Sequence, residues 1–173
     1  MKASVFIGTS VDGFIARTDG SYGFLPEGGG ERHGYDEFMA TVDAVVMGRK
    51  TYETVLGLQA WPYDGKRVFV LSSQPLAPAP AGASVERLSG SVQSIAAELG
   101  ARNIEHAYVD GGVTVQGFLR AGLLQRLIIT RVPVLIGAGI PLFDALERDI
   151  QLKHCATQTY ASGLVKSEYE VIA

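Results

Sequence analysis

A pair of glycines, Gly111-Gly112, separates an apolar segment ending at Val109-Asp110 from a helical pattern that contains Val115 and Phe118. Glycine lets the main chain approach a ligand closely, and free N–H groups at the start of a helix attract an anion. The pair therefore indicates a phosphate-binding turn. A tight turn that needs glycine only for its backbone angles explains the same residues, and the pair alone does not choose between the two.

A second turn of the same form is Gly48-Arg49-Lys50-Thr51, between the apolar segment Ala44–Met47 and a helical pattern that begins at Tyr52. Two cations at a helix N-terminus oppose the helix dipole, so another interaction must favour them there. A bound phosphate is one such interaction. The alternative is a solvated pair of side chains at a frayed helix end.

A third turn, Ser72-Ser73, follows the apolar segment Arg67–Leu71. Its two hydroxyls suit a phosphate or a ribose, although alone they are more typical of a turn into Gln74-Pro75. All three turns follow apolar segments, and ligands of open α/β sheets bind at the carboxyl ends of the strands. The set therefore predicts a dinucleotide or another phosphorylated ligand that lies across one edge of a sheet.

The elements that must position these turns alternate between strand and helix patterns. Continuous apolar runs predict strands, and apolar residues spaced i, i+3, i+4 predict helices. Two segments at the C-terminus flank Ala161-Ser162-Gly163 and predict a hairpin with one solvated face. The result is an α/β fold of three layers, α/β/α, with a mostly parallel central sheet and an antiparallel C-terminal hairpin. The predicted strands are Ala3–Thr9, Ala44–Met47, Arg67–Leu71, Ile104–Val109 and Leu127–Leu135, the hairpin arms Gln151–Tyr160 and Leu164–Ile172, and the helical stripes begin at Tyr35, Tyr52, Val92 and Val115.

Composition restricts the class of protein. The chain has 173 residues, of which 47% are hydrophobic and 19% charged, and these values predict a single globular domain over 1–173. A net charge of −3 predicts no nucleic-acid partner and no membrane surface as partner. One cysteine, Cys155, indicates a reducing compartment, so we expect a cytoplasmic protein. Three scattered histidines predict no metal site.

The segment Gly20–Gly34 is rich in glycine and precedes the helical stripe at Tyr35. Long loops inside compact domains are often lids. We therefore expect this loop to close over the ligand edge.

Five segments together resemble the dihydrofolate reductase-like superfamily, and most closely the C-terminal reductase domain of the riboflavin-biosynthesis deaminase-reductase. They occur in the family's order along nearly the whole chain. The second and third contain MGRKTYE and LSSQP, which are shared across the superfamily, and the last two are typical of the riboflavin-type branch. The segments are SVDGFIA (Ser10–Ala16), VVMGRKTYE (Val45–Glu53), VLSSQP (Val70–Pro75), VDGGVTVQGFLRAGL (Val109–Leu123) and PVLIGAGIPLF (Pro133–Phe143).

The resemblance implies a dihydrofolate reductase-like fold and NADPH as the cofactor. It implies three groups of cofactor contacts, which coincide with the turns above. Those for the pyrophosphate and adenosine are Gly48, Arg49, Lys50 and Thr51, with Leu71 and Ser72 beside the adenosine and Arg49 and Ser73 near the 2′-phosphate; those that cradle the pyrophosphate are Gly111, Gly112, Val113, Thr114 and Val115; those that border the nicotinamide are Gly8, Ile15 and Ala16.

The chain departs from the folate-type pattern in two places. Val113 stands where those enzymes carry an arginine, and their pterin-binding carboxylate has no aligned counterpart. Glu27, Glu31 and Asp36 are the possible substitutes. Asp12, in the SVDG segment, is the predicted catalytic residue, as a polar contact or proton source for the substrate. The alternative for Asp12 is a turn residue ahead of glycine.

By resemblance, the expected reaction is NADPH-dependent hydride transfer to a C=N or C=O carbon, as in 5-amino-6-(5-phosphoribosylamino)uracil reductase, and the expected assembly is a homodimer. A dihydrofolate or pterin reductase, and a reductase of another small molecule, are alternative enzymes. A nucleotide-binding regulatory module without turnover is the non-enzymatic alternative. Deamination is excluded because the chain lacks the H-x-E and P-C-x-x-C motifs that hold its zinc.

Overall fold

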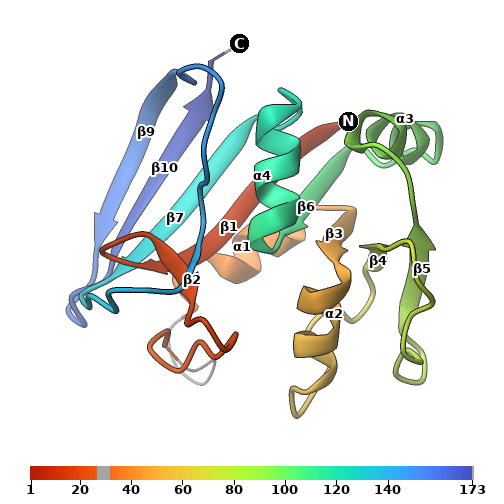
Figure 1. The fold of residues 1–173 in the computed structure, drawn as a ribbon, viewed down its shortest axis with the longest axis horizontal. Helices are drawn as coiled ribbons and strands as arrows, with labels where there is room; N and C mark the ends of the chain where they lie inside the picture. The colour runs from red at the N-terminus through yellow and green to blue at the C-terminus, as the bar shows by residue number, and fades with distance from the viewer. Residues whose placement is uncertain (27–31, 173) are drawn as a thin grey trace.

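The computed structural model describes residues 1–26 and 32–172, and its main feature is one sheet of eight strands in the order β5-β4-β3-β6-β1-β7-β10-β9 (Figure 1). The first six in this order are parallel to one another, whereas β10 is antiparallel to β7 and β9 to β10. The fold class predicted from the sequence is confirmed. The strands are β1 (Lys2–Ser10), β3 (Ala44–Gly48), β4 (Arg67–Leu71), β5 (Ser84–Leu88), β6 (His106–Asp110), β7 (Arg126–Val132), β9 (Leu152–Thr159) and β10 (Val165–Val171).

Helices cover both faces of this sheet. In Figure 1, α4 (Gly112–Arg120) lies on one side and α1 (Tyr35–Ala40) on the other. Phe118 of α4 and Ile95 of α3 (Val92–Ala101) belong to one apolar cluster, while Phe38 of α1 and Tyr52 of α2 (Arg49–Leu56) belong to the second. Successive residues of a buried strand point to opposite faces, so continuous apolar runs such as that of β3 serve both clusters.

Two neighbouring strands separate at their carboxyl ends. β1 pairs with β6 only from Lys2 to Ser4, although it continues beside β7 as far as Ser10. The chain leaves β1 toward α1 and leaves β6 toward α4, which cover opposite faces. In open α/β sheets such a point of divergence forms a crevice where ligands bind. The fold therefore provides an opening between β1 and β6 at the edge where the sequence places its three turns.

A second, two-stranded sheet brings distant residues to this edge. β2 (Phe14–Ala16) pairs with β8 (Ile140–Pro141) in antiparallel register. Strands of two or three residues carry too little periodicity to be predicted, and neither was. β5 was also missed, because its Glu86 and Arg87 interrupt the apolar pattern. β7 ends at Val132, earlier than the predicted Leu135, since Pro133 has no N–H to continue the ladder.

The C-terminal hairpin holds the chain just before α1. Lys166 of β10 donates a hydrogen bond from Nζ to the carbonyl oxygen of His33 at 2.7 Å. A Cβ atom on Gly34 would lie 2.8 Å from the same ammonium, so glycine leaves room for this contact. His33 and Gly34 both have positive φ values, 52° and 86°. This sharp turn directs the chain into α1.

Among the described residues, no helix is long and apolar enough to cross a lipid bilayer. The cytoplasmic location and the single domain over 1–173 stay predictions.

Candidate functional site

Two glycine turns interlock at the carboxyl ends of β3 and β6, which are neighbours in the sheet. A Cβ atom on Gly111 would lie 2.2 Å from Oγ1 of Thr51, in the first turn of α2. Reciprocally, a Cβ atom on Gly48 would lie 3.1 Å from Oγ1 of Thr114, in the first turn of α4. Each glycine thus accommodates a threonine of the other helix. The two helix N-termini are held side by side and open to the same edge.

The main chain at the start of α4 is available to a ligand. Gly111 has φ 87° and ψ 136°, a conformation that glycine alone adopts readily, and no side chain caps the helix. In the part of the chain that the structure describes, the N–H groups of Gly112, Val113 and Thr114 donate to no protein acceptor, as is usual for a first helical turn. The N–H of Val115 donates to the Gly111 carbonyl, and its side chain packs in the core. Of the five residues of the predicted cradle, Gly112, Val113 and Thr114 therefore offer donors, whereas the Gly111 N–H already donates to the Asp110 carboxylate.

The third turn lies beside the first two, because Gly48 and Leu71 are register partners on β3 and β4. The Ser72 hydroxyl both donates to the Gln74 carbonyl at 2.8 Å and accepts from the Gln74 N–H at 3.0 Å. It thus shapes the turn, as the simpler interpretation of this motif expects.

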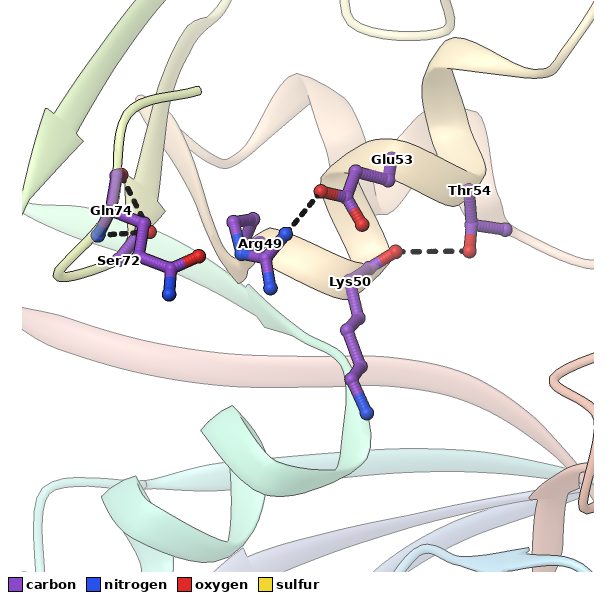
Figure 2. Close-up of polar contacts among 6 residues, drawn as sticks. All are labelled: Arg49, Lys50, Glu53, Thr54, Ser72 and Gln74. Atoms are coloured by element: carbon purple, nitrogen blue, oxygen red, sulfur yellow. Dashed lines mark hydrogen bonds and ion pairs between the residues drawn. The ribbon is translucent and has the colours of Figure 1, made fainter. Parts of the chain in front are cut away.

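The Arg49 guanidinium forms an ion pair with Glu53 at 2.6 Å. Figure 2 shows it between Glu53 and the turn of Ser72 and Gln74, while Lys50 points away from it. The Arg49 side chain is 37% exposed, so it remains accessible to a ligand.

A cavity of about 280 Å³ continues from the third turn toward the start of α3. Three predicted residues line it, together with others that sequence reasoning missed because β5 had not been predicted. The full lining is Leu71, Ser72, Ser73, Leu88, Ser89, Gly90, Val92 and Ile95.

A second cavity, of about 260 Å³, lies at the ends of β1 and β7 on the side of α1. A Cβ atom on Gly8 would lie 3.0 Å from Leu25, so the absence of a side chain at Gly8 keeps space here. Most of its walls are apolar. They are formed by Phe6, Gly8, Leu25, Pro26, Arg32, His33, Tyr35, Thr130, Val132 and Leu164.

β2 connects Ile15 and Ala16 to the glycine turns. A Cβ atom on Gly112 would lie 3.1 Å from Cδ1 of Ile15 and 3.2 Å from the Pro141 carbonyl oxygen. The β2–β8 sheet therefore packs directly against the start of α4. This contact brings the predicted nicotinamide residues and the predicted pyrophosphate residues to one edge.

Asp12 lies on the surface after β1. Its carboxylate accepts the N–H groups of Gly137 at 2.8 Å and Ile136 at 3.3 Å. The Ser10 hydroxyl and these N–H groups lower the pKa of Asp12. The ionised carboxylate of Asp12 thus holds the segment between β7 and β8 in place. The catalytic role of Asp12 stays a prediction.

Sequence reasoning missed Asp110, the last residue of β6. Its carboxylate accepts the Gly111 N–H at 2.8 Å and the Tyr63 hydroxyl at 3.4 Å. Burial raises the pKa of Asp110, although these contacts and the Tyr108 hydroxyl favour the charged form and oppose the rise. The sequence pattern that could have identified Asp110 is a carboxylate at the end of an apolar strand, directly before two glycines. Asp110 is therefore a titratable group at the opening between β1 and β6.

Of the three substitutes considered for a pterin-binding carboxylate, Glu27 and Glu31 lie outside the described residues, as does part of the expected lid over Gly20–Gly34. Asp36 lies in the first turn of α1 and forms a 3.0 Å ion pair with Arg32, with 63% of its side chain exposed. Asp36 is thus on the surface and already paired.

Comparison with known proteins gives a consistent set of similarities. Residues 84–166 match the model of the RibD C-terminal domain. The Bacillus subtilis protein YwjB is 32% identical over 94% of this chain and 94% of its own length. A structure described as "Putative riboflavin biosynthesis protein", from Shewanella sp. PV-4, is 35% identical with a TM-score of 0.92 and covers 100% of both chains.

A more distantly related structure also shares the fold. It is the Thermotoga maritima diaminohydroxyphosphoribosylaminopyrimidine deaminase/5-amino-6-(5-phosphoribosylamino)uracil reductase, 16% identical with a TM-score of 0.74. The similarity covers 99% of this chain and 56% of that protein.

The interlocked turns make a first prediction. Gly111→Ala should lower the free energy of unfolding by about 2–5 kcal/mol, because the new methyl group meets Thr51 and the backbone angles are strained. Gly122→Ala is the control, with φ 68° but open space, and should cost only about 1 kcal/mol. Adding Thr51→Ala to Gly111→Ala should recover part of the loss. Urea unfolding measures all three, and equal losses at 111 and 122 would refute the interlock.

The opposite pKa shifts of Asp110 and Asp12 make a second prediction. A raised pKa means that folding favours the protonated form, so the stabilising effect of Asp110 is lost as pH rises through its raised pKa. The difference in unfolding free energy between Asp110→Asn and the parent protein should therefore shift in favour of the variant as pH rises from about 3 to about 7.

Asp12→Asn should show the reverse, since a lowered pKa stabilises the fold above the ordinary carboxyl range. Unfolding in urea across this pH range measures both differences. Two curves with the same sign would contradict the assignment.

Proposed function

The chain belongs to the RibD C-terminal domain family, and from this membership we propose that it is an NADPH-dependent reductase that delivers hydride to the carbon of a C=N or C=O group. One observation carries the proposal, which is the reciprocal packing of Gly48 with Thr114 and of Gly111 with Thr51. It places two open helix N-termini next to the gap between β1 and β6. A ligand with two linked phosphates and a flat ring suits this combination of edge and gap.

The pyrophosphate would lie over the two turns. Gly48 and Gly111 leave room for Thr114 and Thr51, so the two turns come together under one position for an anion. The N–H groups of Gly112, Val113 and Thr114 supply donors, and both helix dipoles favour negative charge there. Lys50 and Thr51 belong to the same turn.

The adenosine half would enter the cavity beyond β4, between Leu71, Ser72 and Ser73. Arg49 would hold the 2′-phosphate together with Ser73. The exposure of Arg49 supports this role, since 37% of its side chain stays accessible although it pairs with Glu53.

The nicotinamide would lie at the gap between β1 and β6, bordered by Gly8, Ile15 and Ala16. The Phe6 carbonyl points toward β6, because it accepts the Tyr108 hydroxyl at 2.9 Å. Main-chain groups alternate in direction along a strand, so those of Gly8 face the same gap. There the strand has no partner in β6, and its N–H and C=O can bind a carboxamide.

When bound, the cofactor supplies the hydride from C4 of its nicotinamide. The chain orients the acceptor beside it, and the apolar walls around Gly8 exclude water from the reaction. Reduction of an imine or carbonyl also needs a proton. Asp110 retains a proton to higher pH than Asp12 does, so we propose Asp110 or a water molecule that it holds as the source. Asp12 then serves as a structural carboxylate near the edge.

Family membership favours a ribosylaminopyrimidine phosphate as the acceptor, the kind of molecule named for the Thermotoga maritima relative. The assembly we propose is a homodimer. Its support is that every residue of the edge strand β9 is exposed, including Leu152.

Binding of the cofactor makes a third prediction. Arg49→Ala should weaken NADPH by about 10- to 100-fold and NADH by less than about threefold, because only NADPH carries the 2′-phosphate. Glu53→Gln is the matched control, since it frees the guanidinium and should leave NADPH affinity unchanged or higher. Quenching of protein fluorescence measures both. Equal losses for the two cofactors in Arg49→Ala would remove the 2′-phosphate assignment.

The fourth prediction concerns turnover. The protein should oxidise NADPH in the presence of 5-amino-6-(5-phosphoribosylamino)uracil, followed by loss of absorbance at the nicotinamide band. Dihydrofolate and a panel of small carbonyl compounds are tested beside it. Reduction of dihydrofolate with methotrexate inhibition would indicate the pterin reductase instead. NADPH binding without oxidation by any acceptor would indicate the regulatory module.

A further inference from the structure

The chain segments that contain β2 and β8 are bound to one another along their length. The two strands pair, and beyond them the Leu142 N–H donates to the Gly13 carbonyl oxygen at 3.0 Å. The Asp12 carboxylate accepts two N–H groups of the segment that follows β7. We call residues 11–16 and 134–142 the β2–β8 unit, because these contacts join them into one piece.

The β2–β8 unit and α4 carry different parts of the proposed cofactor site. Ile15 and Ala16, which border the proposed nicotinamide position, belong to β2. The N–H groups proposed for the pyrophosphate belong to Gly112, Val113 and Thr114 of α4. In NADPH a ribose joins the nicotinamide to the pyrophosphate, so one molecule has to reach both parts. The position of the unit relative to α4 therefore decides whether both ends of the cofactor can be bound at once.

Gln116 of α4 joins the helix to this unit. Its Nε2 donates to the carbonyl oxygens of Pro141 at 3.1 Å and Leu142 at 3.3 Å. Both partners only accept, so the NH₂ end of the amide must face them, and it has one N–H for each. The Gln116 residue is only 8% exposed. Within residues 1–26 and 32–172, no other hydrogen bond joins α4 to the β2–β8 unit.

The fit between the unit and the start of α4 is close. A Cβ atom on Gly112 would lie 3.2 Å from the Pro141 carbonyl oxygen and 3.1 Å from Cδ1 of Ile15. Gly112 and Gln116 are four residues apart on one helix, so they share a face. The Pro141 carbonyl thus lies against the main chain of the first turn and accepts the amide of the next turn.

Apolar packing holds the unit to α4 without fixing its orientation. Leu142 is 1% exposed and belongs to the same apolar cluster as Val115 and Phe118. Hydrophobic attraction is non-directional, whereas a hydrogen bond requires a restricted distance and angle. The Leu142 side chain therefore keeps the unit attached, and the Gln116 amide sets how it lies over the start of α4.

We propose that Gln116 is a positioning residue for the cofactor. Its amide sets the place of Ile15 and Ala16 relative to the N–H groups of α4, so that nicotinamide and pyrophosphate bind together. The inference rests on the proposed function, since NADPH is the molecule that reaches both parts. Gln116 acts through the main chain of Pro141 and Leu142.

The test replaces the amide by groups of similar length that cannot donate. Gln116→Met removes both N–H donors, and Gln116→Glu, ionised at pH 8, puts oxygen atoms in their place. Gln125→Met is the matched control, because Gln125 Oε1 accepts the buried Ala3 N–H at 2.7 Å, at the opposite end of β1. Calorimetry at pH 8 measures the affinity for NADPH and for 2′-phospho-ADP-ribose, which lacks the nicotinamide. Thermal unfolding is measured on the same proteins.

The ratio of the two affinities measures what the nicotinamide contributes to binding. In Gln116→Met this ratio should fall about tenfold, while the affinity for 2′-phospho-ADP-ribose stays within about threefold of the parent. Gln116→Glu should lose at least as much, since its carboxylate faces two carbonyl oxygens. Gln125→Met should melt at a lower temperature, because it leaves a buried N–H unsatisfied, and yet keep the parent ratio.

A measurement without cofactor tests the attachment itself. The close approach of Ile15 Cδ1 to Gly112 predicts a nuclear Overhauser effect between the Ile15 δ1 methyl protons and the Gly112 α protons. This signal should weaken in Gln116→Met and stay unchanged in Gln125→Met.

An unchanged affinity ratio in Gln116→Met would overturn the proposal. The same fall in Gln125→Met would also overturn it, since loss of any buried hydrogen bond would then explain the effect. So would an unchanged Overhauser signal in Gln116→Met, or a ratio near one in the parent. Failure of the parent to bind NADPH, with the weakened signal in Gln116→Met, would instead refute the proposed function and leave Gln116 as the residue that positions β2 over α4.

Discussion

The reciprocal contact of two βα turns is the constraint on which the arrangement of the site depends. Gly48 lies against Thr114 and Gly111 against Thr51, so neither helix can shift along its strand without colliding with the other turn. This close fit explains how the two turns produce one continuous edge. Cations are present at the start of α2, where the helix dipole alone disfavours them. The anion that we propose between the turns would offset that cost.

The opening between β1 and β6 adds what the turns alone do not provide. Two helix N-termini would bind any phosphate, but the unpaired edge of β1 offers main-chain groups and a flat space beside Gly8. The carboxylate of Asp110 lies on one side of this opening and the cavity of about 260 Å³ on the other side of β1. In the proposed reaction, binding, orientation and proton supply would thus come from three neighbouring strands, β6, β1 and β7.

Much of this arrangement could be predicted from the sequence, for reasons that are local. Glycine after an apolar run indicates a turn at the end of a strand, and parallel strands end at the same edge of a sheet. The sequence therefore predicted that Gly48, Leu71 and Gly111 lie close together. Contacts between residues far apart in the chain could not be predicted in this way. Nothing near Asp12 in sequence indicates that its carboxylate binds Gly137. β5 was missed because charged side chains on an exposed strand conceal its period.

The hydrogen bond from Lys166 to the His33 carbonyl has a consequence for the order of folding. It joins residues 133 positions apart, and the helix that starts at Tyr35 has only six residues, too few to be stable alone. α1 is early in the chain, yet its approach is fixed by the last strand. During synthesis α1 therefore forms stably only after the end of the chain has been made. The aromatic side chains that it covers, Phe6 and Tyr108, become buried only at that late stage.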